Sequence, residues 1–358
     1  MNKTNPGRLF EVDCVKSFAI IYMVCIHVYE QLSVFDHANV MPDSIFRITL
    51  EFLGGPLAAP VFMFCMGIGM IYTRHSTPAD FCRRGIKLLL TGYALNFFRQ
   101  TLLQLIGLML GIDSGLDIAG GLLNGDILEF AGMSFLFTGL MKRVGIRPFT
   151  MCLIAVLIQM TGTLTSGLKV SSMVLECLIG LVLPGGKWVA FPLTLWFVYP
   201  VAGMVFAEQL RQREDRKGLY RKMLIASGTF FAAYTGILVY TGTDIRDFFA
   251  LCNERYYNQT LLSTMWIVPV VIFAISASHF IFRRIEQTKA GDLIRYFSIN
   301  LNRIYIIQWL LISYSVAAVT VTGWEKISSP PVIVLVSAAV IAAAAGINAV
   351  LTRTRLLH

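Results

Sequence analysis

Charged residues are scarce in this sequence. Asp, Glu, Lys and Arg make up 14% of the 358 residues, whereas hydrophobic residues make up 56%. No polar stretch is long enough to form a separate soluble domain, so we treat residues 1–358 as a single domain. Apolar stretches of about 20 residues recur along the chain, which is typical of a protein that crosses a membrane many times.

Motifs for metals, nucleotides and nucleic acids are also missing. The seven cysteines show no spacing typical of a metal site or a redox pair, and no Gly-rich phosphate-binding loop is present. The net charge of +9 comes from basic residues dispersed over short loops, without the pattern of a nucleic-acid-binding module. We therefore expect neither a metal ion nor a nucleic-acid partner.

The apolar stretches predict an all-α transmembrane bundle of about ten spans. The first stretch lacks the cleavage site of a signal peptide, so we expect it to stay in the membrane. The predicted spans are residues 12–32, 48–72, 85–110, 122–141, 148–164, 188–210, 219–240, 261–282, 293–318 and 331–351. The further apolar stretch 170–183 is short for a span, and we expect a re-entrant or interfacial helix there.

The distribution of basic residues predicts the orientation of these spans. Alternate loops on one side carry most of the lysines and arginines, including six in residues 211–222, whereas the loops on the other side carry few. Basic loops remain in the cytoplasm. We therefore expect a multi-pass protein of the cell membrane, with a bacterial cytoplasmic membrane as the simplest assignment, and with both termini in the cytoplasm.

His27 lies deep in the first apolar stretch. An ionisable side chain in hydrocarbon costs a few kcal/mol, so we expect it to face a cavity or a partner. Lys16 precedes it by eleven residues, which is about three helical turns. The two side chains therefore share one face of the helix, about 16 Å apart along its axis, and Glu30 lies one turn beyond His27.

Later spans contain polar residues that could line one wet cavity with His27. Those on which the functional argument depends are Arg99, Asp126, Glu129 and Gln308. Asp126 and Glu129 are three positions apart, so we expect both on one face of the fourth span.

The first apolar stretch resembles the opening helix of a known family. In VDCVKSFAIIYMVCIHVYE, the spacing of Asp13, Lys16, Ala19 and His27 is similar to that in the acyltransferase-3 family of integral membrane acyltransferases. This helix carries the most specific part of the resemblance.

Three further segments resemble the same family. Arg84 and Lys87 in FCRRGIKLLL are similar to its Arg-x-x-Arg pair, with lysine in the second place. The segment FLGGPLAAPVFMFCMGIGM is similar both to that family and to its relative, the heparan-glucosaminide N-acetyltransferase type. The segment NLNRIYIIQWLLIS resembles the Tyr-x-x-His helix of the family, with Gln308 in place of the histidine.

The resemblance implies an integral membrane acyltransferase. Such an enzyme takes an acyl group, which we expect to be acetyl, from acyl-CoA in the cytoplasm. It passes this group to a hydroxyl or an amine of an extracytoplasmic glycan or small molecule. Lys16, Arg84 and Lys87 would bind the CoA phosphates. His27 would lie near the thioester as a general base or as the carrier of a transient acyl group.

For the remaining polar residues, the sequence suggests a general role but not a specific contact. Glu30 or Glu129 would orient the imidazole of His27, and Arg99 would bind the acceptor or the developing oxyanion. Asp126 and Gln308 would complete the substrate-binding surface. Besides acyl-CoA and the acceptor, the expected partners are membrane lipid and, as an open alternative, further copies of the chain.

Other interpretations of the same residues remain open. Buried polar groups also suit a transporter or exporter of a lipid-linked or amphipathic metabolite, although we detect no two related halves of the kind common in transporters. A catalytically idle relative that binds a lipid or a partner is a weaker alternative. His27 could also cross-link helices by hydrogen bonding, and Arg99 could form a purely structural ion pair with Asp126 or Glu129.

Overall fold

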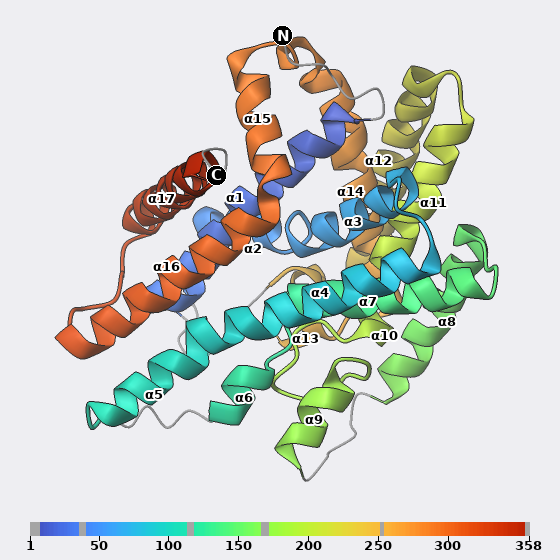
Figure 1. The fold of residues 1–358 in the computed structure, drawn as a ribbon. Helices are drawn as coiled ribbons and strands as arrows, with labels where there is room; N and C mark the ends of the chain where they lie inside the picture. Colours follow the sequence, from blue (N-terminus) through green and yellow to red (C-terminus); the bar gives the residue numbers. More distant parts are fainter. Residues whose placement is uncertain (1–7, 36–40, 113–117, 166–171, 251–253, 355–358) are drawn as a thin grey trace.

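The computed structural model describes residues 8–35, 41–112, 118–165, 172–250 and 254–354 (Figure 1). All regular secondary structure in these ranges is helical, and the predicted all-α fold class is confirmed. The elements are α1 (Phe10–Leu32), α2 (Ile45–Gly54), α3 (Ala59–Tyr72), α4 (Pro78–Asn96), the π-helical turn η1 (Phe97–Thr101), α5 (Leu102–Met109), α6 (Ile118–Leu123), α7 (Ile127–Arg143), α8 (Pro148–Leu164), α9 (Met173–Gly180), α10 (Leu193–Trp196), α11 (Val198–Gln212), α12 (Arg216–Tyr240), the 3-10 turn η2 (Ile245–Phe248), α13 (Glu254–Tyr257), α14 (Leu261–Ile281), the 3-10 turn η3 (Arg283–Ile285), α15 (Lys289–Ile299), α16 (Leu301–Thr322) and α17 (Pro330–Thr354).

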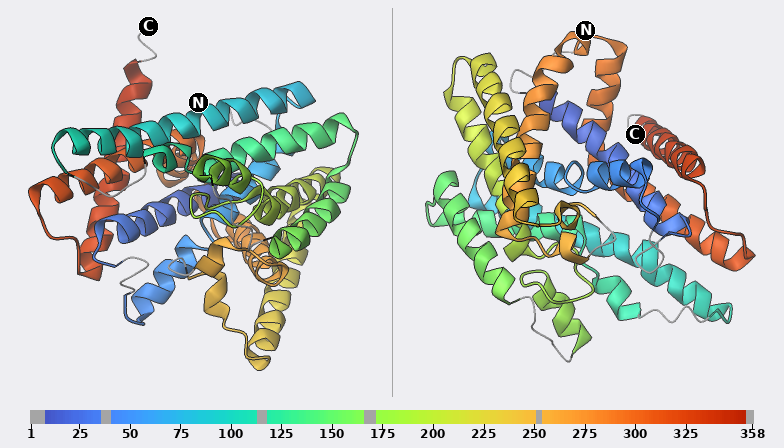
Figure 2. Two further views of the ribbon diagram at one scale, coloured as in Figure 1. Left: turned by 90° about the horizontal axis from the view of Figure 1, so that it is seen from below. Right: turned by 180° about the vertical axis from the view of Figure 1, so that it is seen from behind.

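Helix α1 lies at the centre of the bundle (Figures 1 and 2). It packs against α2, α3, α14, α15, α16 and α17. Most of its side chains are buried because the helix is apolar on nearly every face. Its few polar side chains, Lys16 and His27 among them, are therefore in contact with neighbouring helices.

Glycines allow two pairs of helices to approach closely. A Cβ atom on Gly67 of α3 would lie 1.8 Å from the carbonyl oxygen of Pro200 in α11, and one on Gly203 would lie 2.0 Å from that of Phe64. Similar contacts join α4 to α7, which run side by side in Figure 1. Small residues at helix crossings are typical of membrane bundles, where close van der Waals packing replaces the hydrophobic effect.

Seven helical segments are long and apolar enough to cross a membrane. They are Phe10–Leu32, Ile45–Tyr72, Leu193–Gln212, Arg216–Tyr240, Leu261–Ile281, Leu301–Thr322 and Pro330–Arg353. The first, second and third of these are mostly buried within the protein, whereas few residues of α12, α16 and α17 are buried, as expected of helices that face lipid. The predicted count of ten spans and the predicted orientation stay predictions.

Several predicted spans are interrupted. The span predicted at 48–72 divides into α2 and α3, and that at 293–318 divides at Asn300 into α15 and α16. The helix predicted from residue 188 begins only at Leu193. In the short stretch 170–183, whose first two residues lie outside the described ranges, α9 has eight residues and is too short to span a membrane.

The prediction of one continuous fourth span, 122–141, is wrong. Helix α6 ends at Leu123 and α7 begins at Ile127. Asp126 has an extended backbone, and its side chain accepts a hydrogen bond from the backbone N–H of Ile127 at 2.8 Å, so it caps α7 from outside. The sequence had suggested that Asp126 and Glu129 lie on one helical face. They do not, because Asp126 lies before the first residue of α7.

Candidate active site

One large cavity lies where α1, α5 and α16 end. Its volume is about 1160 Å³, and its walls come from α1, η1, α5, α16, the segment before α7 and the loop before α10. This exceeds the volume of typical small-molecule sites, about 300–1,000 Å³. Of the predicted site residues, the described walls include His27, Glu30, Arg99 and Asp126.

His27 is held by two consecutive residues of α16. Its Nδ1 atom lies 3.3 Å from Oε1 of Gln308, and its ring packs on the indole of Trp309 with the centroids 4.0 Å apart. In the neutral tautomer with its hydrogen on Nδ1, His27 donates to this amide oxygen and its Nε2 is an acceptor. Gln308 is fully buried and is not among the described lining residues. The structure thus places it behind His27, where it contacts the imidazole and not the cavity.

Arg99 lies on the cavity wall in the π-helical turn η1. Its side chain is only 2% exposed, and its Nη1 atom is 3.1 Å from Oδ2 of Asp126. Its Nε donates to Oδ1 of Asn96 at 3.1 Å, and its guanidinium lies 4.3 Å from the centre of the Trp309 ring. The ion pair between Arg99 and Asp126 that the sequence allowed is therefore present, and Trp309 contacts both Arg99 and His27.

Asp126 and Glu129 form a capping box at the start of α7. Oε2 of Glu129 accepts from the backbone N–H of Asp126 at 2.9 Å, and its Oε1 accepts from Nδ2 of Asn96 at 3.2 Å. Gly92 makes room for this carboxylate, since a Cβ atom there would lie 2.1 Å from Oε1. Asp126 also accepts from the hydroxyl of Tyr305 at 2.9 Å. Glu129 is 1% exposed and lies outside the described cavity walls.

Glu30, one turn beyond His27 in α1, also lines the cavity. Its Oε1 atom is buried and has no hydrogen-bond partner within the described part of the chain. The same is true of Oε1 of Gln104 and of the indole nitrogens of Trp188 and Trp309, three further residues of the cavity wall. Four wall residues thus have buried polar atoms whose hydrogen bonds are not made among the described residues, and leaving such atoms unpaired costs free energy.

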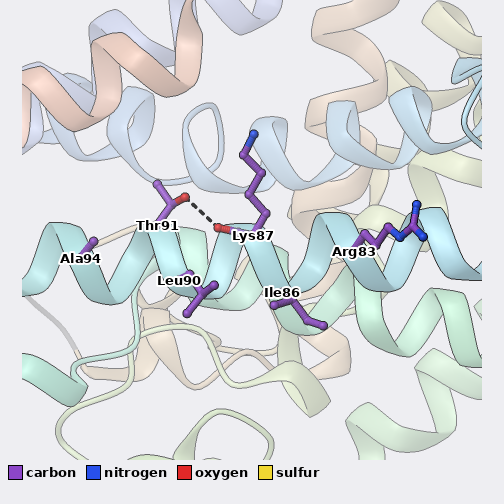
Figure 3. Close-up of a pocket in the computed structure, with 6 residues that line it drawn as sticks. All are labelled: Arg83, Ile86, Lys87, Leu90, Thr91 and Ala94. Atoms are coloured by element: carbon purple, nitrogen blue, oxygen red, sulfur yellow. Dashed lines mark hydrogen bonds between the residues drawn. The ribbon is translucent and has the colours of Figure 1, made fainter.

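The three predicted phosphate-binding residues lie elsewhere. Nζ of Lys16 donates to the backbone carbonyl of Ser298 at 3.2 Å, and the guanidinium of Arg84 lies 4.6 Å from the centre of the Phe135 ring. Lys87 is exposed in a groove of about 490 Å³ along α4 (Figure 3). None of the three is among the described residues that line the His27 cavity.

Sequence analysis missed two residues that build this site, Trp309 and Tyr305, and assigned no role to a third, Asn96. Trp309 contacts both His27 and Arg99, Tyr305 binds Asp126, and Asn96 binds Arg99 and Glu129. Tyr305 had a signal, since it is the tyrosine of the Tyr-x-x-His-like segment. For Trp309, the sequence contained no signal of a role in the site other than its position next to Gln308. Among the described residues, no group of three side chains is arranged to hold a metal ion.

These features define a multi-pass membrane protein with a histidine and an ion-paired arginine on the wall of one large cavity. A model of the heparan-alpha-glucosaminide N-acetyltransferase catalytic family matches residues 8–241, well over half of the chain. The chain belongs to this family. No curated protein and no solved structure matches it.

The family match supports part of the sequence prediction. The family is the one to which FLGGPLAAPVFMFCMGIGM was found similar, and it indicates a membrane transferase of the acetyltransferase kind. Membership of acyltransferase-3 itself is not shown by it. The matched residues include His27, Arg99 and Asp126, whereas Gln308 and Trp309 lie beyond them.

Proposed function

We propose that this protein transfers an acetyl group from cytoplasmic acetyl-CoA to a hydroxyl or amine of an extracytoplasmic glycan or small molecule. The observation that carries the proposal is His27, which lies on the wall of a large cavity with Gln308 in contact with its Nδ1 atom. Membership of a family of N-acetyltransferases, whose members use acetyl-CoA as donor, supports the choice of acyl group and donor.

The cavity suits the reacting end of the donor. Its volume of about 1160 Å³ accommodates an acylated pantetheine arm together with an acceptor. The bound donor supplies an activated thioester carbonyl. Lys16 lies on the same helix about 16 Å from His27, a distance of the order of that arm, and with Arg84 and Lys87 it would attract the phosphates from the other end of the bundle.

His27 acts as the general base in this proposal. Nε2 takes the proton from the acceptor hydroxyl or amine as its oxygen or nitrogen attacks the thioester carbonyl carbon. When the tetrahedral intermediate collapses, the carbon–sulfur bond breaks, and the imidazolium returns the proton to the departing thiolate. A positioned base of this kind contributes about 10²–10⁴-fold to the rate. A transient acyl group on Nε2 is the covalent alternative.

The other polar residues support this step. Glu30, with an unpartnered carboxylate oxygen on the same wall, would hold the acceptor beside His27. Arg99 would stabilise negative charge that develops in the cavity, and Asp126 would hold the guanidinium in place. Glu129 would position Asp126 and Asn96 from behind.

Incubation of the purified protein with labelled acetyl-CoA tests the proposal. We expect the wild type to release CoA and pass the label to an acceptor, whereas a transporter would leave the thioester intact. His27→Ala and His27→Gln should both lose at least about a hundredfold in rate, because neither side chain accepts the proton. His75→Gln, at an exposed loop position, is the matched control. Substantial activity in His27→Gln would show that a hydrogen bond suffices and that His27 is not the base.

A further inference from the structure

The indole N–H of Trp309 differs from those of Trp196 and Trp266 in its lack of a partner among the described residues. Trp196 donates its ring N–H to the carbonyl of Tyr257 at 3.1 Å, and Trp266 donates to Oγ1 of Thr235 at 2.9 Å. The N–H of Trp309 is buried and has no acceptor among the described residues, although the ring lines the cavity and touches His27. The fold thus leaves one indole donor free beside the proposed base.

A second observation concerns the charge next to this ring. The guanidinium of Arg99 lies 4.3 Å from the ring centre and is held there by Asp126 and Asn96. A cation on an aromatic face is attracted to the ring and withdraws electron density from it, which makes the N–H a stronger donor. The contacts to Arg99 and His27 also fix the position of the indole before any ligand binds.

The unpartnered polar atoms of the cavity are of two kinds. Glu30 and Gln104 each have a buried acceptor oxygen without a partner, whereas Trp309 and Trp188 each have a buried donor N–H without one among the described residues. A nucleophile with an O–H or N–H matches the first kind, and a carbonyl oxygen matches the second. Of the two donors, the indole of Trp309 is the one whose ring packs against the proposed base His27.

We infer that the N–H of Trp309 is a catalytic donor that binds the thioester carbonyl oxygen as it becomes an oxyanion. This inference rests on the proposed function. When the acceptor attacks the carbonyl carbon, the C=O electron pair moves onto oxygen and His27 takes the acceptor proton. The oxyanion accepts a hydrogen bond from the indole N–H of Trp309 until the C=O bond re-forms and the thiolate leaves. A preorganised donor is most effective in such a site because it needs no reorganisation during the reaction.

Two replacements at position 309 distinguish hydrogen-bond donation by the indole N–H from packing by the indole ring. β-(3-Benzothienyl)alanine has the shape of tryptophan with sulfur in place of the ring N–H, so the contacts with His27 and Arg99 are kept. Trp309→Phe keeps an aromatic face with a smaller ring. Loss of one oxyanion donor lowers kcat by about a hundredfold or more. We expect that loss in both variants, with a KM for acetyl-CoA within about twofold of the wild-type value, since the donor acts mainly in the transition state.

Two controls accompany these variants. Trp324→Phe alters an indole that is 75% exposed and should leave kcat unchanged. Trp266→Phe removes an indole N–H that already has a partner outside the cavity, so it should lower thermal stability and leave kcat per folded molecule unchanged.

The outcomes distinguish this inference from the proposed function. If the wild type transfers acetyl and the benzothienyl variant does so equally fast, the donor role of Trp309 is refuted and only its packing role is left. A raised KM with unchanged kcat would likewise refute it, because the N–H would then bind the ground state. If the wild type releases no CoA in the presence of acceptors, the proposed function itself fails.

Discussion

Replacing Glu129 tests whether its carboxylate has a catalytic role or a structural one. The sequence suggested a catalytic role, whereas the structure places the side chain in a capping box behind the cavity wall. Glutamine suits a capping box as well as glutamate does, because its amide oxygen also accepts a backbone N–H. It cannot serve as a proton acceptor. Glu129→Gln and Glu129→Ala should therefore behave differently if the role is structural.

The contacts of Glu129 give the size of the effect. In Glu129→Ala the backbone N–H of Asp126 loses its acceptor, which costs about 1–3 kcal/mol for a buried donor. The loss of the contact with Asn96 costs less free energy, because its Nδ2 also donates a hydrogen bond to the carbonyl of Asn124 at 2.6 Å. In Glu129→Gln the capping bond is kept and only the contact with Asn96 is lost, so we expect a cost of about 1 kcal/mol.

Thermal unfolding and CoA release measured on the same preparations give the answer. We expect Glu129→Ala to lower the unfolding midpoint by about 4 °C, from roughly 2 °C per kcal/mol in a chain of this size, and to lose activity as Asp126 moves away from Arg99. Glu129→Gln should keep most of its activity. Glu214→Gln, at an exposed loop position, is the control. A Glu129→Gln variant that is as stable as the wild type but inactive would refute the structural role.

Two further predictions concern the donor and the orientation. Arg84→Ala and Lys87→Ala should weaken binding of desulfo-CoA in a salt-sensitive way, measured by calorimetry, because contacts between cations and phosphate are lost; unchanged affinity in both would leave these residues as topology anchors. Single-cysteine probes at Lys326 should react with an impermeant reagent in intact cells, whereas probes at Lys217 should be protected. Labelling at Lys217 from outside would reverse the predicted orientation.

Helix α1 shows what local spacing predicts well. The predicted span 12–32 differs from α1 (Phe10–Leu32) by two residues at one end. Lys16 and His27 were placed on one face, and both contact the α15–α16 segment, at Ser298 and Gln308. These features follow from helical periodicity within a single segment, which needs no knowledge of the rest of the fold.

The start of α7 shows a signal that hydropathy conceals. Asp126 and Glu129 have the three-residue spacing of a capping box, but the apolar residues on both sides suggested one continuous span from 122 to 141. The break at residues 124–126 gives the two acids different environments. Asp126 lines the cavity and pairs with Arg99, whereas Glu129 is buried behind it. Roles that depend on this difference could not follow from the spacing alone.

The contacts of Trp309 depend on tertiary structure entirely. They join α1, η1 and α16, which lie far apart in the sequence, and a tryptophan in an apolar helix is as typical of a lipid-facing anchor as of a site. Gln308, next to it, stands where the Tyr-x-x-His pattern considered in the sequence analysis has its histidine. In the tautomer with its hydrogen on Nδ1, His27 donates to the neutral amide oxygen of Gln308. In that tautomer, Nε2 is free to take the acceptor proton without a second ionisable group beside the imidazole.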